Sequence, residues 1–220
     1  MSARVRDSFV LGVRPSRVPG YVGTKWPVAK GRIKRLEARW PKPLVNLIRP
    51  ALKRQEPFVI PAEHFKEPVP VERTDRFRKI ADFIGRDRQL EETFWFQDLC
   101  EDLRQTGIAR HKTVEMRSEA EIVAFFRTYV QPLIASLRKD GFRPDKTGFE
   151  STAVIDADGR LAKSGSGNHR FVMSQVLDLP SFPLKIVAVH EDWFQREVLR
   201  EGDTLAALKD ALSRVEAAHQ

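Results

Sequence analysis

A polar, glycine-punctuated stretch from Lys163 to Arg170 separates two apolar segments and constrains the fold more than any other feature. Before it, the pair Asp158-Gly159 lies between two short apolar runs, which predicts a β-hairpin. After it, apolar residues recur at helical spacing from Val172 to Leu177, which predicts a helix with Asn168 as its N-cap. The stretch is therefore expected to join a hairpin to a helix N-terminus.

This position makes the stretch a candidate anion site. The first N–H groups of a helix have no intrahelical acceptor and carry the positive end of the helix dipole. His169 can donate or accept a proton near neutral pH, and Arg170 offers a planar fork of donors to phosphate or carboxylate oxygens. The candidate ligand-binding residues are Lys163, Ser164, Gly165, Ser166, Gly167, Asn168, His169 and Arg170. The alternative is a tight glycine turn, a capped helix and two solvated side chains.

The chain resembles the ParB/sulfiredoxin superfamily from about Thr106 to Trp193. The resemblance is carried by the run Gly167-Asn168-His169-Arg170 and the helix after it, then by the strand Pro183–His190 with its ending His190-Glu191-Asp192-Trp193. It is strongest to bacterial ParB-like proteins that carry a G-x-H-R segment. It implies an α+β fold, with a small mixed β-sheet and packed helices, that binds nucleotide phosphates at the motif.

The resemblance leaves the activity open. Members of the superfamily hydrolyse CTP, use ATP to activate a sulfinic acid, or phosphorylate free serine, so fold alone does not decide whether this chain is an enzyme. It implies a nucleotide (ATP, ADP or CTP) with Mg²⁺ as the cofactor. A nucleotide-dependent phosphotransferase and a nucleotide hydrolase are both compatible with it, as is binding without catalysis.

Two departures from the superfamily exclude two of its known activities. Sulfiredoxins carry their catalytic cysteine directly before the His-Arg pair, where this chain has Asn168, and its only cysteine is Cys100 in an upstream helical segment. Chromosome-partition members continue with Glu-Arg-Arg and a helix-turn-helix domain, which do not follow the motif here. Neither sulfinic-acid reduction nor chromosome segregation is expected.

Further candidates lie outside the motif. By the resemblance, Ile108–Met116 forms the first strand and a loop near the ligand, so His111 and Lys112 are secondary ligand-binding candidates. His190 ends the last strand, and strand ends form the ligand crevice in such layers, so it could approach the same anion as His169. The alternatives are a solvated strand end for the first pair and a capped strand end for His190.

His169 and Glu150 are the candidate catalytic residues, each as a proton acceptor. Glu150, Asp156 and Asp158 are carboxylates close to the motif in sequence that could hold Mg²⁺, but the two aspartates belong to the hairpin turn and are better explained by it. No dedicated metal site is therefore predicted.

Positive charge is concentrated at the N-terminus. Residues 1–56 contain 14 Lys or Arg and three acids, a net charge of +11, whereas the remaining residues have a net charge of −3. The segment is rich in proline with little periodicity, which predicts an irregular basic extension that either wraps the domain as extended segments anchored by Trp26 and Trp40 or stays partly loose. Cations interleaved with tryptophan could bind nucleic acid weakly, or the arm could simply be solvated.

The pattern divides the chain into a basic Pro-rich extension (1–60), a helical lobe (61–105), a ParB-like domain (106–200) and a C-terminal helix (201–220). Thr74 should cap the first helix of the lobe, and a second helix should span about 89–105. Ser118 opens a capping box, and Pro132 should break the following helix near Thr128. The C-terminal helix should fold back or form a homodimer contact.

A single cysteine excludes an internal disulfide framework and suits a reducing cytosol. No apolar run approaches the roughly eighteen residues that a membrane-spanning helix needs. We therefore expect a cytoplasmic protein that binds a nucleotide or phosphorylated small molecule and has no membrane partner. The alternatives are a non-enzymatic nucleic-acid-associated module that uses the basic arm, and a partner-binding protein with a degenerate site.

Overall fold

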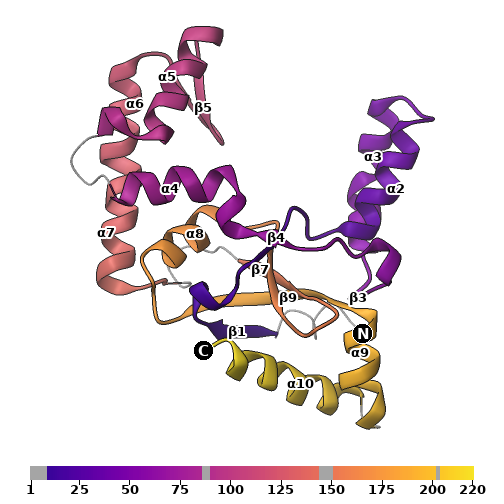
Figure 1. The fold of residues 1–220 in the computed structure, drawn as a ribbon. Helices are drawn as coiled ribbons and strands as arrows, with labels where there is room; N and C mark the ends of the chain where they lie inside the picture. Colours follow the sequence, from indigo (N-terminus) through magenta and orange to yellow (C-terminus); the bar gives the residue numbers. More distant parts are fainter. Residues whose placement is uncertain (1–8, 86–89, 144–150, 202–203) are drawn as a thin grey trace.

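The computed structural model describes residues 9–85, 90–143, 151–201 and 204–220. Within these ranges the main sheet has seven strands in the order β1-β9-β7-β8-β2-β4, with β3 beside β9 (Figure 1). Its strands are β1 (Val10–Val13), β2 (Gly20–Val22), β3 (Val59–Ile60), β4 (Val69–Pro70), β7 (Thr152–Ile155), β8 (Leu161–Ser164) and β9 (Phe182–His190). Parallel and antiparallel pairs both occur, so the expected α+β class with a mixed sheet is confirmed.

The helices pack on this sheet or extend from it. They are α2 (Pro27–Glu37), α3 (Lys42–Arg54), α4 (Asp75–Gly85), α5 (Phe94–Thr106), α6 (Glu119–Phe125), α7 (Gln131–Asp140), α8 (Asn168–Val176), α9 (Glu191–Glu197) and α10 (Thr204–Ala218). In Figure 1, α4 to α7 form a lobe on one side, α2 and α3 project separately, and α10 lies below the sheet. None of the helices that the structure describes is both long and apolar enough to span a bilayer.

Strand β9 is an internal strand of the sheet, with partners on both of its edges. One edge pairs with β7, and the other pairs with β1 near the start of β9 and with β3 near its end. Its neighbour β7 forms the predicted hairpin with β8. In the turn, Asp156 Oδ1 accepts hydrogen bonds from the N–H groups of Asp158 (3.0 Å) and Arg160 (2.9 Å), so this aspartate serves the turn.

Local signals located several helix ends correctly. Thr74 Oγ1 accepts a hydrogen bond from the N–H of Phe77 (3.2 Å), and Ser118 Oγ accepts one from Glu121 (3.2 Å). The break before Pro132 is a π-helical segment, Phe126–Val130, between α6 and α7. The second lobe helix begins later than expected, at Phe94, because Thr93 caps it.

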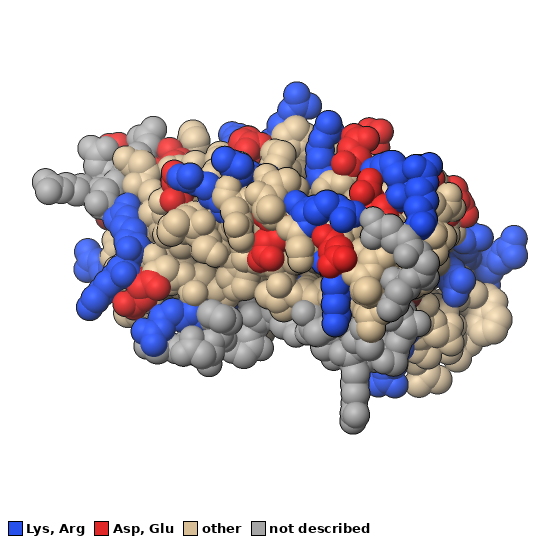
Figure 2. Space-filling model, turned by 90° about the horizontal axis from the view of Figure 1, so that it is seen from below, with Lys and Arg blue, Asp and Glu red and all other residues tan. Residues whose placement is uncertain are grey.

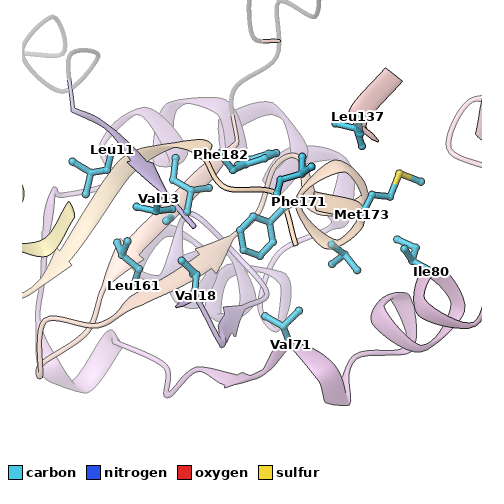
Figure 3. Packing of buried hydrophobic residues seen from close by; sticks show 14 of the residues in the cluster. Leu11, Val13, Val18, Val71, Ile80, Leu137, Leu161, Phe171, Met173 and Phe182 are labelled. Atoms are coloured by element: carbon cyan, nitrogen blue, oxygen red, sulfur yellow. The ribbon is translucent and has the colours of Figure 1, made fainter. Parts of the chain in front are cut away.

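The expected irregular N-terminal arm is wrong for residues 9–56. Strand β1 pairs with β9 and β2 pairs with β8, so this segment completes both sides of the sheet. Figure 3 shows Leu11, Val13 and Val18 among the buried side chains around Phe171, and all three are at most 4% exposed. Strands of three or four residues are too short to show periodicity, and their pairing partners lie far away in sequence.

The expected first strand of the sheet is also wrong. Residues from Ala109 to Met116 form a separate antiparallel hairpin in the lobe, made of β5 (Ala109–His111) and β6 (Val114–Met116). The reason is a tight reversal at Lys112, whose φ of 55° turns the chain back on itself. Pairing within the hairpin replaces pairing with the main sheet.

The C-terminal helix folds back, which is one of its two predicted roles. The Glu216 carboxylate accepts a hydrogen bond from the N–H of Gly12, and the His219 carbonyl accepts one from Arg14 (2.7 Å). These bonds satisfy one donor on β1 and one directly after it at the edge of the sheet, and an uncovered edge strand would invite pairing with other chains. Helix α10 therefore closes this edge.

We expect the N-terminal segment to contribute directly to stability. Val13→Ala removes a fully buried side chain from β1 and should lower the free energy of unfolding by about 2 kcal/mol in urea titrations. Val10→Ala, on the same strand but 51% exposed, is the matched control and should change it by less than about 0.5 kcal/mol. Equal effects of the two substitutions would contradict the pairing of β1 described above.

Candidate functional site

The loop between β8 and α8 is held from inside by Lys163, which is 1% exposed. Its Nζ donates hydrogen bonds to the carbonyls of Thr152 (3.0 Å), Ser164 and Ser166. Burial lowers the pKa of Lys163 to about 7, with repulsion from Arg76 and Lys25 adding to it. The three carbonyl acceptors act in the opposite direction, because they favour the charged ammonium. Lys163 therefore braces the loop and does not line the pocket beside it.

Ser164 and the glycines shape the same loop. Ser164 is fully buried, and its hydroxyl donates to Thr152 Oγ1 (2.9 Å), so this side chain is also turned away from the pocket. Gly167 has a φ of 77°, in the left-handed region that favours glycine. At Gly165, whose φ is 22°, an added Cβ would lie 3.2 Å from Lys25 Cγ. The glycines thus allow the chain to turn tightly next to the helix start.

The predicted N-cap role of Asn168 is wrong. Gly167 is the N-cap of α8, and Asn168 is the first helical residue. Its Nδ2 points back into the loop and donates to the carbonyl of Gly165 (3.0 Å) and to the Tyr21 hydroxyl (3.4 Å). The left-handed turn at Gly167 causes this change, because it moves the helix start one residue earlier. Asn168 Oδ1 is buried and has no hydrogen-bond partner among the described residues.

A pocket of about 540 Å³ opens beside this loop and the first turn of α8. One wall is formed by the residues from Gly165 to Arg170. The other walls come from the lobe and from the next turn of α8, and consist of Arg76, Trp95, His111, Lys112, Tyr129, Leu133 and Met173. No aspartate or glutamate is among these lining residues, so the part of the pocket that the structure describes is cationic on its polar side.

Aromatic contacts fix the imidazole of His169 at the junction of lobe and sheet. Trp95 stacks on it with ring centroids 5.9 Å apart, and His111 meets it edge-on at 4.9 Å. Phe125 in turn packs against His111 at 5.0 Å. The two histidines, which lie far apart in sequence, are therefore adjacent in a layer of packed rings.

Crowded positive charge and burial lower the pKa values of the basic groups in the pocket. The pKa of His169 falls to about 3, first because of burial and then because of Arg76, His111 and Lys112. The pKa of His111 falls to about 4, because of burial, Lys112 and Arg76. Burial lowers the pKa of Lys112 as well, and Arg170 and Arg76 add to the effect. Both imidazoles are therefore neutral at pH 7, and an anion would relieve the repulsion.

The structure brings His111 and Lys112 together with the loop, but it separates His190 from it. His190 is the N-cap of α9, where its Nδ1 accepts a hydrogen bond from the N–H of Asp192 (3.1 Å). Its ring meets Phe65 at 4.8 Å and lines a different pocket of about 610 Å³. The cause is strand direction, because β9 runs parallel to β7 and therefore ends at the hairpin turn, opposite the loop. The prediction that His190 contacts the same bound anion as His169 is therefore wrong.

Glu150, the second candidate catalytic residue, lies outside the described residues. Sequence reasoning missed Arg76 on α4, whose Nε is buried and has no hydrogen-bond partner in the described ranges. It also did not single out Trp95 or Tyr129 for the site. Helical periodicity gave no signal for these residues, since their role arises from the docking of the lobe beside α8.

The chain matches no protein-family model, curated protein or solved structure in the comparisons made. Within the described residues, no group of three or more His, Cys, Asp or Glu side chains could hold a metal ion. The site is therefore interpreted from its own geometry.

The lowered pKa of His169 should make stability depend on pH. Its pKa is about 3 in the folded state and 6.5 in the reference state, so between these values the unfolded chain binds the extra proton and acid favours unfolding. Between about pH 6.5 and about pH 5, the free energy of unfolding should fall by about 2 kcal/mol more for the wild type than for His169→Gln. Denaturant titrations at several pH values measure this, and parallel pH curves for both proteins would contradict it.

Proposed function

We propose that the chain binds a nucleotide, or another phosphorylated ligand, in the pocket beside the Gly167-Asn168-His169-Arg170 loop. The observation that carries the proposal is the convergence of Arg76, Lys112 and Arg170 on a pocket with no carboxylate among its described lining residues. An anionic ligand in this pocket would meet Lys112 and Arg76, whose buried Nε has no hydrogen-bond partner in the described ranges.

The main chain at the start of α8 supports the same ligand. The N–H groups of Asn168 and His169 precede the first intrahelical bond, which runs from Phe171 to the carbonyl of Gly167 (3.0 Å). Such groups donate to phosphate oxygens at helix N-termini, and the helix dipole adds to the attraction. The glycines on either side of Ser166 let phosphate oxygens approach the backbone closely.

The position of Lys112 in the β5–β6 hairpin also supports an anionic ligand. Its φ of 55° lies in the left-handed region, which costs most non-glycine residues about 1–2 kcal/mol. The two-residue turn between His111 and Val114 requires this conformation. At the tip of the β5–β6 hairpin, it holds the Lys112 ammonium at the pocket.

The apolar lining residues of the pocket favour a ligand larger than inorganic phosphate. Tyr129, Leu133 and Met173 line the pocket beside its cationic groups, and the Tyr129 ring stacks on Phe125 at 5.5 Å, which holds it in place. An apolar wall next to a phosphate site suits a ligand with a nucleoside or similar organic group. This is why a nucleotide is placed first among the phosphorylated ligands.

We further propose that the chain is ParB/sulfiredoxin-like over the part of the resembling segment from Thr152 to His190, since Ala109–Met116 form a separate hairpin and not a strand of the main sheet. The support is the succession of hairpin, glycine loop, helix α8 and strand β9 around the G-x-H-R sequence. In phosphotransfer or nucleotide hydrolysis, Arg76, Lys112 and Arg170 would stabilise charge on the phosphates, and His169 would accept a proton once the bound phosphates raise its pKa. The described lining residues offer Mg²⁺ no carboxylate, so no step is assigned to a metal.

Arg76→Gln should weaken nucleotide binding without unfolding the protein. Loss of a charged donor to phosphate should raise the Kd for ATP, ADP or CTP roughly tenfold or more in isothermal titration calorimetry. Arg73→Gln, an exposed arginine three residues earlier that does not line the pocket, is the matched control. If none of the nucleotides binds the wild type, or both variants bind equally well, the proposed function is wrong.

Lys112→Gly should weaken nucleotide binding without lowering the stability of the ligand-free protein. Glycine accepts the left-handed backbone, so the ligand-free protein should keep its stability or gain up to about 1 kcal/mol, while nucleotide affinity falls. Lys112→Gln removes the same charge but keeps the strain, so it should lose affinity without the gain. Thermal unfolding with and without nucleotide measures both effects. A large loss of stability in Lys112→Gly would show that the lysine is structural.

A further inference from the structure

The helical hairpin α2–α3 (Pro27–Arg54, the basic hairpin) carries the unbalanced charge of the whole chain. It contains nine Lys or Arg and a single acid, Glu37, a net charge of +8 that equals the net charge of the full sequence. The acid is itself paired, since Glu37 Oε1 lies 2.6 Å from Arg49 Nη2. The rest of the chain is neutral overall, and Figure 2 shows Lys and Arg intermingled with Asp and Glu on the face below the sheet.

The basic hairpin is a folded element that projects from the sheet. Its base is tied down by Glu56, whose carboxylate oxygens accept hydrogen bonds from the N–H groups of Val28 (2.8 Å) and Ala29 (2.7 Å). Inside it, α2 and α3 share a small core that includes Ile33 and Val45. Figure 1 shows that the connection between the two helices is directed away from the sheet. The tip can therefore reach a flat surface before the body does.

The hairpin also exposes apolar side chains that its own core leaves uncovered. Leu44, Leu47 and Ala51 recur at three- and four-residue spacing on α3 and are all exposed, Leu47 to 78% (these residues are the apolar stripe). Trp40, in the connection at the tip, is 52% exposed. Apolar residues on one face of a helix beside a high density of cations are typical of helices that lie in a lipid interface.

We propose that the basic hairpin docks on an anionic lipid surface, with the apolar stripe and Trp40 entering the interfacial layer and the surrounding Lys and Arg contacting acidic headgroups. Charge complementarity selects this occupant. A second copy would bring together two hairpins of net charge +8. Nucleic acid would pair with the cations, but its phosphate backbone offers no partner to Leu44 and Leu47. A lipid surface accounts for both features, and tryptophan is enriched at such interfaces.

This proposal reverses the sequence-based expectation that the protein has no membrane partner. That expectation rested on the absence of a spanning segment. Surface docking needs no spanning segment, and only the folded hairpin separates the inner face of α3, with Val45, from its exposed stripe. The proposal is independent of ligand binding at the Gly167–Arg170 loop.

The test is co-sedimentation of the full chain with vesicles of phosphatidylcholine alone and with vesicles of equimolar phosphatidylcholine and phosphatidylglycerol. We expect binding to the anionic vesicles only, with a blue shift of tryptophan fluorescence that Trp40→Phe diminishes. The double variant Leu44→Ser/Leu47→Ser should lower the partition coefficient roughly tenfold or more. Leu199→Ser, which changes a leucine that is 55% exposed outside the hairpin, is its matched control.

A second pair of variants tests the charge. Arg39→Glu/Lys42→Glu, on both sides of Trp40, should abolish binding to anionic vesicles, whereas Lys209→Glu on α10 should leave most of it. Equal binding to neutral vesicles, or undiminished binding by the double serine variant, would overturn the proposal. Binding to duplex DNA or to RNA without binding to anionic vesicles would also overturn it and would assign the hairpin to nucleic acid.

Discussion

The arrangement of the sheet depends on one requirement, which is that the backbone groups of strand β9 are hydrogen-bonded on both edges of the strand. Its nine residues are buried or half-buried, so their N–H and C=O groups must be paired within the protein. One edge is satisfied by β7, but the other edge is satisfied only by β1 and β3, which come from the N-terminal part of the chain. The sheet therefore cannot be completed by the segment that carries the loop motif. This requirement explains why a proline-rich basic segment is part of the core.

The same sheet decides which polar groups can meet. Because β7 and β9 run parallel, the loop before α8 and the end of β9 lie at opposite ends of the sheet. His169 and His190 consequently line different pockets. The site is completed from the lobe, where the β5–β6 hairpin and α4 supply Lys112 and Arg76. A cationic pocket results from the docking of the lobe beside α8, and the aromatic layer of Trp95, His111 and His169 fills the junction.

Positive charge is concentrated in the pocket and on the basic hairpin, and the two groups of cations differ in burial. In the pocket, a few basic groups are partly buried and crowded, which lowers the pKa values of Lys112 and the two histidines, and the ligand proposed there is a phosphorylated molecule. On the basic hairpin, nine cations are spread along a projection beside exposed leucines, which suits an extended anionic surface. Burial separates the two cases, since exposed charges are screened by water and salt. The two proposals can therefore fail or succeed separately.

The sequence alone determined the elements whose signals are local. The Asp158-Gly159 turn, the caps at Thr74 and Ser118, the break before Pro132 and the helix over 204–218 depend on neighbouring residues, and all were predicted. It also located the glycine loop and two of its partners, His111 and Lys112. Only the tertiary structure decided the strand pairing of β1 and β2, the separation of His190 from the loop and the position of Arg76 at the pocket. These features depend on contacts between residues far apart in the chain, and such contacts leave no periodicity in a single sequence.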